Sequence, residues 1–314
     1  MKAAVIEHYG CPEEFIIKHL PSPDIKDGQV LVENKASSVN PVDTLVRQGK
    51  TKLITGIIGD QLLGSDFSGI VIQSRSDKFK VGDEVFGLNS AVKGGSYAEQ
   101  IVVDQEDLTF KPVNLSFTEA AVLPLVGLTA WQGLVTEGNI QKGDRVLITG
   151  CTGGVGSVAV QIAKTFDAYI TGTCSAKNRD FAESLGVDKI IDYETEKISS
   201  DQIFDLIFDA SGHFTISDLK ENLTKDAMFV TTKGGADDLK GIASVAIDLT
   251  FQKRMKIVVM EQNSVDLNIL KALVEDGKLK PFITKTFSLD NITEAHRMME
   301  DDSFSGKIAI QIGN

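Results

Sequence analysis

The sequence predicts an α/β protein with two domains, an irregular β domain and a doubly wound parallel-sheet domain. The 314 residues exceed the roughly 250–300 at which a single hydrophobic core stops growing. Short β-type segments fill the chain up to about residue 111, and from about residue 143 apolar runs alternate with helical stretches. A glycine cluster at 150–156 joins one of these runs to a helix.

The composition, with 42% hydrophobic and 24% charged residues, is that of an ordinary globular protein. A net charge of -12 excludes a broad surface for nucleic acid or anionic membrane, because both need an excess of Lys and Arg. No stretch approaches the roughly 18 apolar residues of a membrane span, and no apolar run follows a basic start. We therefore expect a soluble cytoplasmic protein that acts on small molecules.

Cysteine and histidine are too scattered to predict a disulfide framework or a zinc knot. The residues concerned are Cys11, Cys151, Cys174, His8, His19, His213 and His296. None of them forms a short-spaced pair or an H-x-x-x-H motif. A metal site would need ligands that only the fold brings together, and we expect none.

The first domain is predicted to span residues 1–120. Its β segments are AAVIEHYG, FIIKHL, QVLVENKAS, FSGIVIQSRS, DEVFGL and AEQIVVD, separated by Pro, Gly and Asp. Near the carboxyl end, a helix over 266–277 with Gly277 as its C-cap is followed by strands that end in GKIAIQIGN. Those strands need a sheet to join, so residues 262–314 are expected to complete the first domain.

The second domain is predicted to span residues 121–261 and to be of the Rossmann type. Its apolar runs are RVLITG, AYITGT, KIID, FDLIFDA, AMFVTT and KIVVM. Such runs suit strands that are buried on both faces of a parallel sheet, and the lengths between them suit crossover helices.

The glycine cluster lies between the apolar run 145–149 and an amphipathic helix, which is the context of a dinucleotide-binding turn. Cys151 takes the first position of the G-x-G-x-x-G fingerprint, and Gly150 supplies a second, three-residue glycine spacing. A helix start attracts anions. The residues predicted to face a dinucleotide phosphate are Gly153, Gly154, Val155 and Gly156. The alternative is a turn that only lets a helix pack on a strand.

The residues after the second strand favour NADPH over NADH. An NAD site usually carries Asp or Glu about 20 residues after the turn, whereas this chain has Ser175, Lys177 and Arg179 there. A hydroxyl and two cations suit a 2′-phosphate. The alternative is that both cations only belong to the solvated first turn of a helix over 177–186, where Asp180 moderates their charge.

Taken together, the chain resembles the medium-chain dehydrogenase/reductase superfamily, and within it the zinc-free, zeta-crystallin-like quinone oxidoreductase branch. The matching stretches are SSVNPVDTLVRQG, LLGSDFSGIV, FKVGDEVFGL, GGSYAEQIVV, EAAVLPLVGLTAWQGL, VLITGCTGGVGSVAVQIAK and SGKIAIQI. The resemblance implies a GroES-like first domain, a homodimer, and NADPH-dependent reduction of quinones or α,β-unsaturated carbonyl compounds. Alternatives are an enoyl-thioester reductase and a non-catalytic NADPH-binding protein.

The resemblance also implies that the protein works without zinc. Zinc-dependent members of the superfamily carry a Cys ligand where this chain has Asn40, and Gly-His-Glu where it has Gly64, Ser65 and Asp66. Two ligand positions are therefore lost.

Further site residues follow from the resemblance alone. Asn40 and Asp43 are expected beside the nicotinamide as catalytic residues, and Asn40, Thr129, Tyr193 and Lys307 are expected to contact the cofactor. Hydride transfer leaves negative charge on an acceptor oxygen, which needs a proton or hydrogen-bond donor. Asn40, a cofactor hydroxyl and water are the candidates.

Each of these residues also has a structural explanation. Asn40 and Asp43 suit the N-cap and third position of a short helix that stops at Gly49, and the two roles are compatible. Thr129 suits an ordinary helix position, Tyr193 suits the covering of apolar surface, and Lys307 suits an exposed strand.

Overall fold

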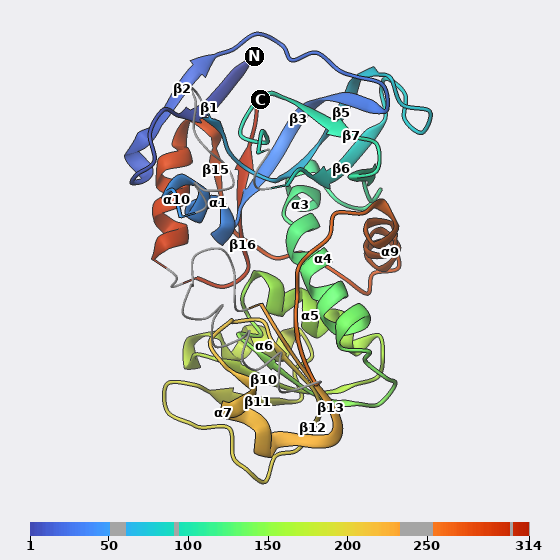
Figure 1. Ribbon diagram of the computed structural model, residues 1–314, viewed down its shortest axis with the longest axis vertical. Coiled ribbons are helices and arrows are strands. Elements are labelled where there is room, and N and C mark those ends of the chain that lie inside the picture. Colours follow the sequence, from blue (N-terminus) through green and yellow to red (C-terminus); the bar gives the residue numbers. More distant parts are fainter. Residues whose placement is uncertain (51–60, 91–93, 233–253, 302–303, 314) are drawn as a thin grey trace. The chain divides into compact units, whose positions relative to one another are not determined.

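The computed structural model describes residues 1–50, 61–90, 94–232, 254–301 and 304–313. The chain forms two compact units (Figure 1). Unit 1 comprises Met1–Leu125, Glu261–Gly277 and Pro281–Asn314, and unit 2 comprises Val126–Met260 and Lys278–Lys280. Among the described helices, none combines the length and the apolar character that crossing a membrane requires.

The main sheet of unit 1 is organised around the long strand β3 (Gln29–Val39). β3 pairs antiparallel with β5 (Asp66–Ser74), β7 (Gln100–Asp104) and β16 (Lys307–Gln311). The sheet continues through β6 (Glu84–Leu88) and β8 (Leu108–Phe110) on one side and through β15 (Ile283–Ser288) on the other. The carboxyl-terminal strand β16 therefore lies beside the amino-terminal strand β3, with Ala309 opposite Ser38.

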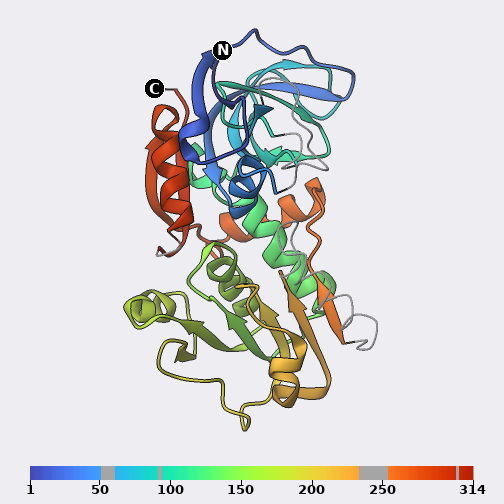
Figure 2. The ribbon, with the colours of Figure 1, turned by 60° about the vertical axis from the view of Figure 1, so that its left-hand side comes forward.

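Alternating apolar residues form the core of this sheet, because successive side chains of a strand point to opposite faces. The buried set is Val30, Val32, Phe67, Val71, Phe79, Val85, Ile101, Val103 and Leu108. A smaller sheet is made of β1 (Lys2–Ile6), β2 (Phe15–His19) and β4 (Gln61–Leu62). Helices α1 (Pro41–Arg47) and α10 (Ile292–Glu300), far apart in sequence, lie side by side (Figures 1 and 2). Unit 1 also contains α3 (Phe117–Ala121) and α9 (Ser264–Glu275).

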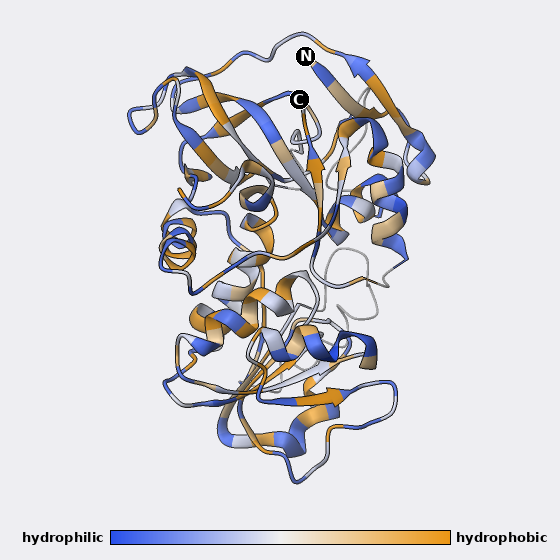
Figure 3. Ribbon diagram, turned by 180° about the vertical axis from the view of Figure 1, so that it is seen from behind, coloured by the Kyte–Doolittle hydropathy of each residue, from blue (hydrophilic) through white to orange (hydrophobic). Residues whose placement is uncertain are grey.

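Unit 2 contains a parallel sheet in the order β11-β10-β9-β12-β13-β14. The strands are β9 (Arg145–Thr149), β10 (Tyr169–Cys174), β11 (Lys189–Asp192), β12 (Phe204–Asp209), β13 (Leu223–Thr231) and β14 (Met255–Ile257). Its helices include α5 (Gly154–Lys164), α6 (Arg179–Ser184) and α7 (Ile216–Leu219). The hydrophobic colouring of these strands in Figure 3 matches a sheet that is buried on both faces.

The order of strands reverses between β9 and β12, which is where doubly wound sheets bind their ligands, outside the carboxyl ends of the strands. β9 ends at Thr149, directly before the glycine turn, and β12 ends at Asp209. The predicted fold class is thereby confirmed, with an antiparallel β unit and a doubly wound parallel-sheet unit.

Sequence interpretation differs from the structure at one weak strand and at the ends of two helices. β15 was not identified as a separate strand, because its residues ITKTFS are largely exposed and show no apolar alternation. The helix expected over 177–186 is a 3₁₀ turn over Ala176–Asn178 followed by α6. α9 begins two residues before the predicted helix, and Gly277 follows it with a φ of 70° as a helix-ending glycine should.

Candidate functional site

The glycine turn of unit 2 leads from β9 into α5 with little space for side chains. Gly150 has a φ of 59°, which disfavours residues with a Cβ. A Cβ added to Gly156 would lie 2.1 Å from the carbonyl oxygen of Gly150. Gly156 therefore lets the helix begin directly against the turn, which is the role of the last glycine in the dinucleotide fingerprint.

The first hydrogen bond of α5 runs from the amide of Ser157 to the carbonyl of Gly153, over 2.9 Å. The amides of Gly154, Val155 and Gly156 precede this bond and belong to the first helical turn, whose N–H groups have no carbonyl acceptor within the helix. Together with the positive end of the helix dipole, these amides form a site suited to a phosphate group.

The end of β10 lies next to this turn. The amides of Gly150 and Cys151 each donate a hydrogen bond to Thr173, one to its hydroxyl and one to its carbonyl, both over 3.0 Å. Ser175 follows at the end of β10 and is buried, and its hydroxyl accepts a hydrogen bond from the side chain of Asn178 over 3.2 Å. Lys177 lies on the exposed 3₁₀ turn between them.

Two further predicted residues of unit 2 are placed by neighbouring elements. Tyr193 directly follows β11, is 58% exposed, and donates its amide hydrogen to the carbonyl of Cys174 over 3.3 Å. The structure thus brings Tyr193 and Ser175 to one edge of the sheet. Thr129 is buried within α4 (Pro124–Trp131). Arg179 is half-exposed and has Glu196 at 4.0 Å.

Sequence interpretation missed a buried carboxylate at the end of β12. Asp209 accepts hydrogen bonds from the hydroxyls of Thr149 (2.6 Å), Ser211 (2.8 Å) and Thr231 (2.8 Å) and from the amide of Phe214 (3.1 Å). These bonds fix the loop that follows β12 against the end of β9. The sequence shows that Asp209 ends an apolar run, but it does not show the hydroxyl donors, which come from three separate segments of the chain.

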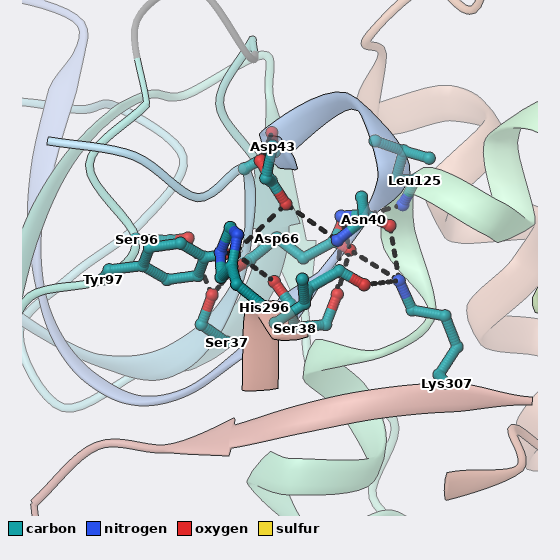
Figure 4. A network of polar contacts seen from close by, with 12 residues as sticks. Ser37, Ser38, Asn40, Asp43, Asp66, Ser96, Tyr97, Leu125, His296 and Lys307 are labelled. Atoms are coloured by element: carbon teal, nitrogen blue, oxygen red, sulfur yellow. Dashed lines mark hydrogen bonds and ion pairs between the residues drawn. The ribbon is translucent and has the colours of Figure 1, made fainter. Parts of the chain in front are cut away.

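Unit 1 holds a dense network of buried polar side chains around Asp66, at the start of β5 (Figure 4). One carboxylate oxygen accepts hydrogen bonds from the hydroxyl of Ser38 (2.6 Å) and the amide of Asn40 (2.9 Å). The other accepts a hydrogen bond from the backbone amide of Leu125, over 2.8 Å. Lys307 lies 3.8 Å from the same carboxylate and compensates its charge.

Lys307 fixes the orientation of Asn40. Its ammonium donates to the side-chain oxygen of Asn40 and, over 3.0 Å, to the carbonyl of Val39. Because lysine only donates, the oxygen of the Asn40 amide must face Lys307 and its nitrogen must face Asp66. Both residues are buried, so the structure contradicts the exposed strand position considered for Lys307.

Asp43 occupies the third position of α1 and is also buried. Its carboxylate accepts hydrogen bonds from the backbone amide of Asn40 (2.8 Å) and from the hydroxyls of Ser65 (3.2 Å) and Tyr97 (3.2 Å). The helix start predicted from Asn40, Pro41 and Asp43 is confirmed, and Gly49 follows the helix with a φ of 73°. Burial, opposed by the hydrogen bond from the Asn40 amide and assisted by nearby Asp66, raises the pKa of Asp43 to about 7.

A chain of hydrogen bonds extends from Asp43 to the surface of unit 1. The Tyr97 hydroxyl contacts Nε2 of His296 over 3.2 Å, and Nδ1 of His296 accepts from Nε of Arg47 over 3.4 Å. Because arginine cannot accept, the neutral imidazole carries its proton on Nε2. Burial, assisted by Arg47, lowers the pKa of His296 to about 3. Arg47 is itself buried and also bonds to Glu300 on α10.

Burial and the neighbouring carboxylates have opposite effects on the pKa of Lys307. Burial lowers the pKa of Lys307, while Asp66 and Asp43 act in the opposite direction. For Tyr97, by contrast, burial and the nearby Asp43 both raise the pKa. Among the residues that the structure describes, no three His, Cys, Asp or Glu side chains are grouped as metal ligands would be.

Comparisons with known proteins agree with this architecture. Residues 26–113 match the alcohol dehydrogenase GroES-like domain, and residues 185–310 match the zinc-binding dehydrogenase family. The chain is 32% identical to the human mitochondrial NAD(P)H oxidoreductase RTN4IP1, over 99% of this chain and 89% of that protein. The chain belongs to the medium-chain dehydrogenase/reductase superfamily.

Other superfamily members show similarity over the whole chain. The 2-methylene-furan-3-one reductase of Solanum lycopersicum is 33% identical over 99% of this chain and 79% of that protein. The structure of the quinone oxidoreductase from Coxiella burnetii superposes with a TM-score of 0.89 at 29% identity, covering 100% of this chain and 99% of that one. These relatives support an oxidoreductase that uses a nicotinamide cofactor.

Proposed function

We propose that this superfamily member is a zinc-independent, NADPH-dependent reductase of quinones or α,β-unsaturated carbonyl compounds. The observation that carries the proposal is the glycine turn, where the missing Cβ of Gly156 lets α5 begin directly against the turn and three first-turn amides are suited to hold a pyrophosphate. The names of similar proteins, which include quinone oxidoreductases and an enone reductase, support the acceptor class.

The preference for NADPH rests on the residues at the end of β10. Ser175 occupies the place where NAD-dependent members carry an acidic side chain, and Lys177 adds a positive charge on the exposed turn that follows. We propose that these two residues bind the 2′-phosphate and that Tyr193 contacts the nucleotide half of the cofactor. Gly153, Gly154, Val155 and Gly156 would hold the pyrophosphate, and Thr129 would lie near the nicotinamide half.

Bound NADPH supplies the hydride, and the chain's own residues position the reactants and stabilise charge. Asn40 and Asp43 are our candidates on the substrate side. The Asn40 amide donates to Asp66 and accepts from Lys307, so its proposed contribution is a fixed position rather than proton transfer. Lys307 is predicted from the sequence to contact the cofactor. It would act by holding Asn40 in place and by compensating the negative charge of Asp66.

The decisive experiment follows NADPH oxidation by the chelator-treated protein with a small quinone, a small enone, or no acceptor, and repeats each reaction with NADH. We expect acceptor-dependent oxidation that favours NADPH. Oxidation that needs added zinc, or that favours NADH, would contradict the proposal. NADPH-dependent thermal stabilisation without turnover would instead select a non-catalytic binding protein, and a preference for acyl thioesters would select an enoyl-thioester reductase.

Variants at the end of β10 sharpen this test. Ser175→Asp should shift the preference towards NADH, because a carboxylate repels the 2′-phosphate and accepts a hydrogen bond from a free ribose hydroxyl. Lys177→Ala should raise KM for NADPH with little change for NADH. Lys142→Ala is the matched control, since Lys142 is a strongly exposed lysine of the same unit with Asp167 as its partner.

We also propose that the protein forms a homodimer, and light scattering of the purified protein tests this.

A further inference from the structure

Two buried thiols of unit 2 meet beside the proposed cofactor site. Cys151 belongs to the glycine turn and is fully buried, and Cys174 is the last residue of β10 and is 1% exposed. Both are free thiols, as is the exposed Cys11 of unit 1. Sequence spacing gave no reason to pair Cys151 with Cys174, because the fold alone brings the ends of β9 and β10 together.

The backbone places the two side chains on one face of β10. Residues two apart on a strand point to the same side, so Gly172 and Cys174 share a face. A Cβ added to Gly172 would lie 2.6 Å from the sulfur of Cys151. The Cys151 sulfur therefore occupies the space above Gly172, on the face from which Cys174 projects. The bond from the Cys151 amide to the Thr173 carbonyl, over 3.0 Å, holds this arrangement.

The chemistry of the two sulfurs is unequal. A hydrogen bond from the Cys151 thiol lowers the pKa of Cys174, and the positive charge of Arg179 acts in the same direction against burial and Asp192. The same hydrogen bond, together with burial, raises the pKa of Cys151. Cys174 is thus the more readily ionised sulfur, and the thiolate is the form that peroxide oxidises.

We propose that Cys151 and Cys174 form a reversible disulfide when the protein meets a peroxide, and that this disulfide switches off cofactor binding. The Cys174 thiolate attacks one peroxide oxygen and becomes a sulfenic acid; the O–O bond breaks, and the other oxygen leaves as hydroxide, which takes up the proton lost by Cys174 to give the first water. The Cys151 sulfur then attacks the sulfenic sulfur, the S–O bond breaks, and the hydroxyl leaves with the Cys151 proton as the second water. In balance, two thiols and one hydrogen peroxide give one disulfide and two waters. A dithiol reductant restores both thiols by disulfide exchange.

A covalent bond would disturb the turn because the turn has no room to adjust. Disulfide sulfurs lie about 2.05 Å apart, much closer than two thiols in contact. Drawing Cys151 towards Cys174 moves the backbone between Gly150 and Gly156. This backbone is tightly packed, because a Cβ added to Gly156 would lie only 2.8 Å from the Cα of Cys151. Cys174 directly precedes Ser175, so both proposed phosphate contacts are affected. This consequence rests on the proposed cofactor site.

The test treats full-length protein carrying Cys11→Ala with hydrogen peroxide, and then with dithiothreitol. Intact mass and a non-reducing peptide map detect the disulfide, and NADPH-dependent thermal stabilisation reports cofactor binding. We expect a loss of two hydrogens, a linked peptide pair containing Cys151 and Cys174, and loss of the NADPH-dependent stabilisation, all reversed by dithiothreitol. Cys151→Ala and Cys174→Ala in the same background should form no disulfide and should keep their own NADPH response after peroxide.

Each of the other outcomes overturns one part of the proposal. Absence of the linked peptides in peroxide-treated protein overturns the disulfide. Presence of the linked peptides with unchanged NADPH stabilisation overturns the switch. If the reduced protein shows no NADPH stabilisation, the proposed function fails, while the mass and the peptide map still decide whether the disulfide forms. Melting of each reduced variant without NADPH identifies any variant that does not fold.

Discussion

The polar network of unit 1 and the glycine turn of unit 2 form their candidate sites in opposite ways. Around Asp66, buried charged and polar side chains from β3, β5, α1 and β16 satisfy one another. At the glycine turn, the first-turn amides of α5 have no acceptor within the helix, and the missing side chain of Gly156 lets the helix begin against the turn.

The difference predicts how each site tolerates substitution. In the network, each group compensates a buried charge or polar atom, so removal of one partner leaves another without compensation. In the turn, added atoms do the damage, because the neighbouring backbone fills the space. The predictions below test whether deletion harms unit 1 and addition harms unit 2, beginning with the largest effect.

Lys307→Met should lower the free energy of unfolding by about 3–5 kcal/mol, because it leaves the carboxylate of Asp66 buried without its cation. Adding Asp66→Asn to this variant should recover part of the loss, since the uncompensated charge is then gone. Urea unfolding of the two variants measures both effects. The control is Lys285→Met on β15, the neighbouring strand, where the lysine is exposed. Equal losses for Lys307→Met and Lys285→Met would contradict the importance of the buried charge.

Gly156→Ala should lower stability by about 1–3 kcal/mol, because the new methyl group would overlap the Gly150 carbonyl at 2.1 Å. It should also abolish thermal stabilisation by NADPH. Gly153→Ala is the comparison within the same turn, since its φ of -74° suits alanine and its Cβ would lie 3.3 Å from the same oxygen. We expect a smaller loss of stability there. Similar unfolding curves for the two variants would show that close packing at Gly156 is not the constraint.

The same contrast explains what the sequence could predict. The glycine turn is local: a strand, the glycines and a helix follow one another within residues 145–164, so pattern and spacing were sufficient. The network is not local, and Asp66 attracted attention only as a missing zinc ligand. Its contacts with Lys307 and Leu125 depend on pairing of β16 with β3 and on the start of α4. Tyr97 and His296 carried no spacing that indicated a link to Asp43.

Two titrating groups of the network should affect stability in opposite directions. The pKa of Asp43 is raised from 3.8 to about 7, so the folded state holds a proton that the unfolded state has lost, and stability falls as pH rises through this range. The pKa of His296 is lowered from 6.5 to about 3, so the unfolded state binds the proton first, and stability falls as pH decreases from 6.5. Their effects oppose each other where the ranges overlap.

Removing either group and subtracting the wild-type stability should isolate the contribution of the group that was removed. The stability of Asp43→Asn minus that of the wild type should rise with pH between 3.8 and about 7, and that of His296→Gln should fall between about 3 and 6.5. Each slope should be at most about 1.4 kcal/mol per pH unit, the value for one proton. Urea unfolding at closely spaced pH values measures both differences. Slopes of the same sign would contradict the protonation states assigned to Asp43 and His296.

The smallest effect is expected for the surface ion pair of Arg145 and Asp205 in unit 2. Its geometry is good, with bonds of 3.0 and 3.1 Å to the two carboxylate oxygens, and the hydrogen bond from Arg145 lowers the pKa of Asp205. Arg145 is nevertheless 50% exposed. Water therefore solvates its charge and weakens its attraction to Asp205. Arg145→Gln should therefore cost less than about 1 kcal/mol, and added salt should reduce this cost. A loss as large as that of Lys307→Met would show that bond geometry, rather than burial, determines how much an ion pair of this protein contributes.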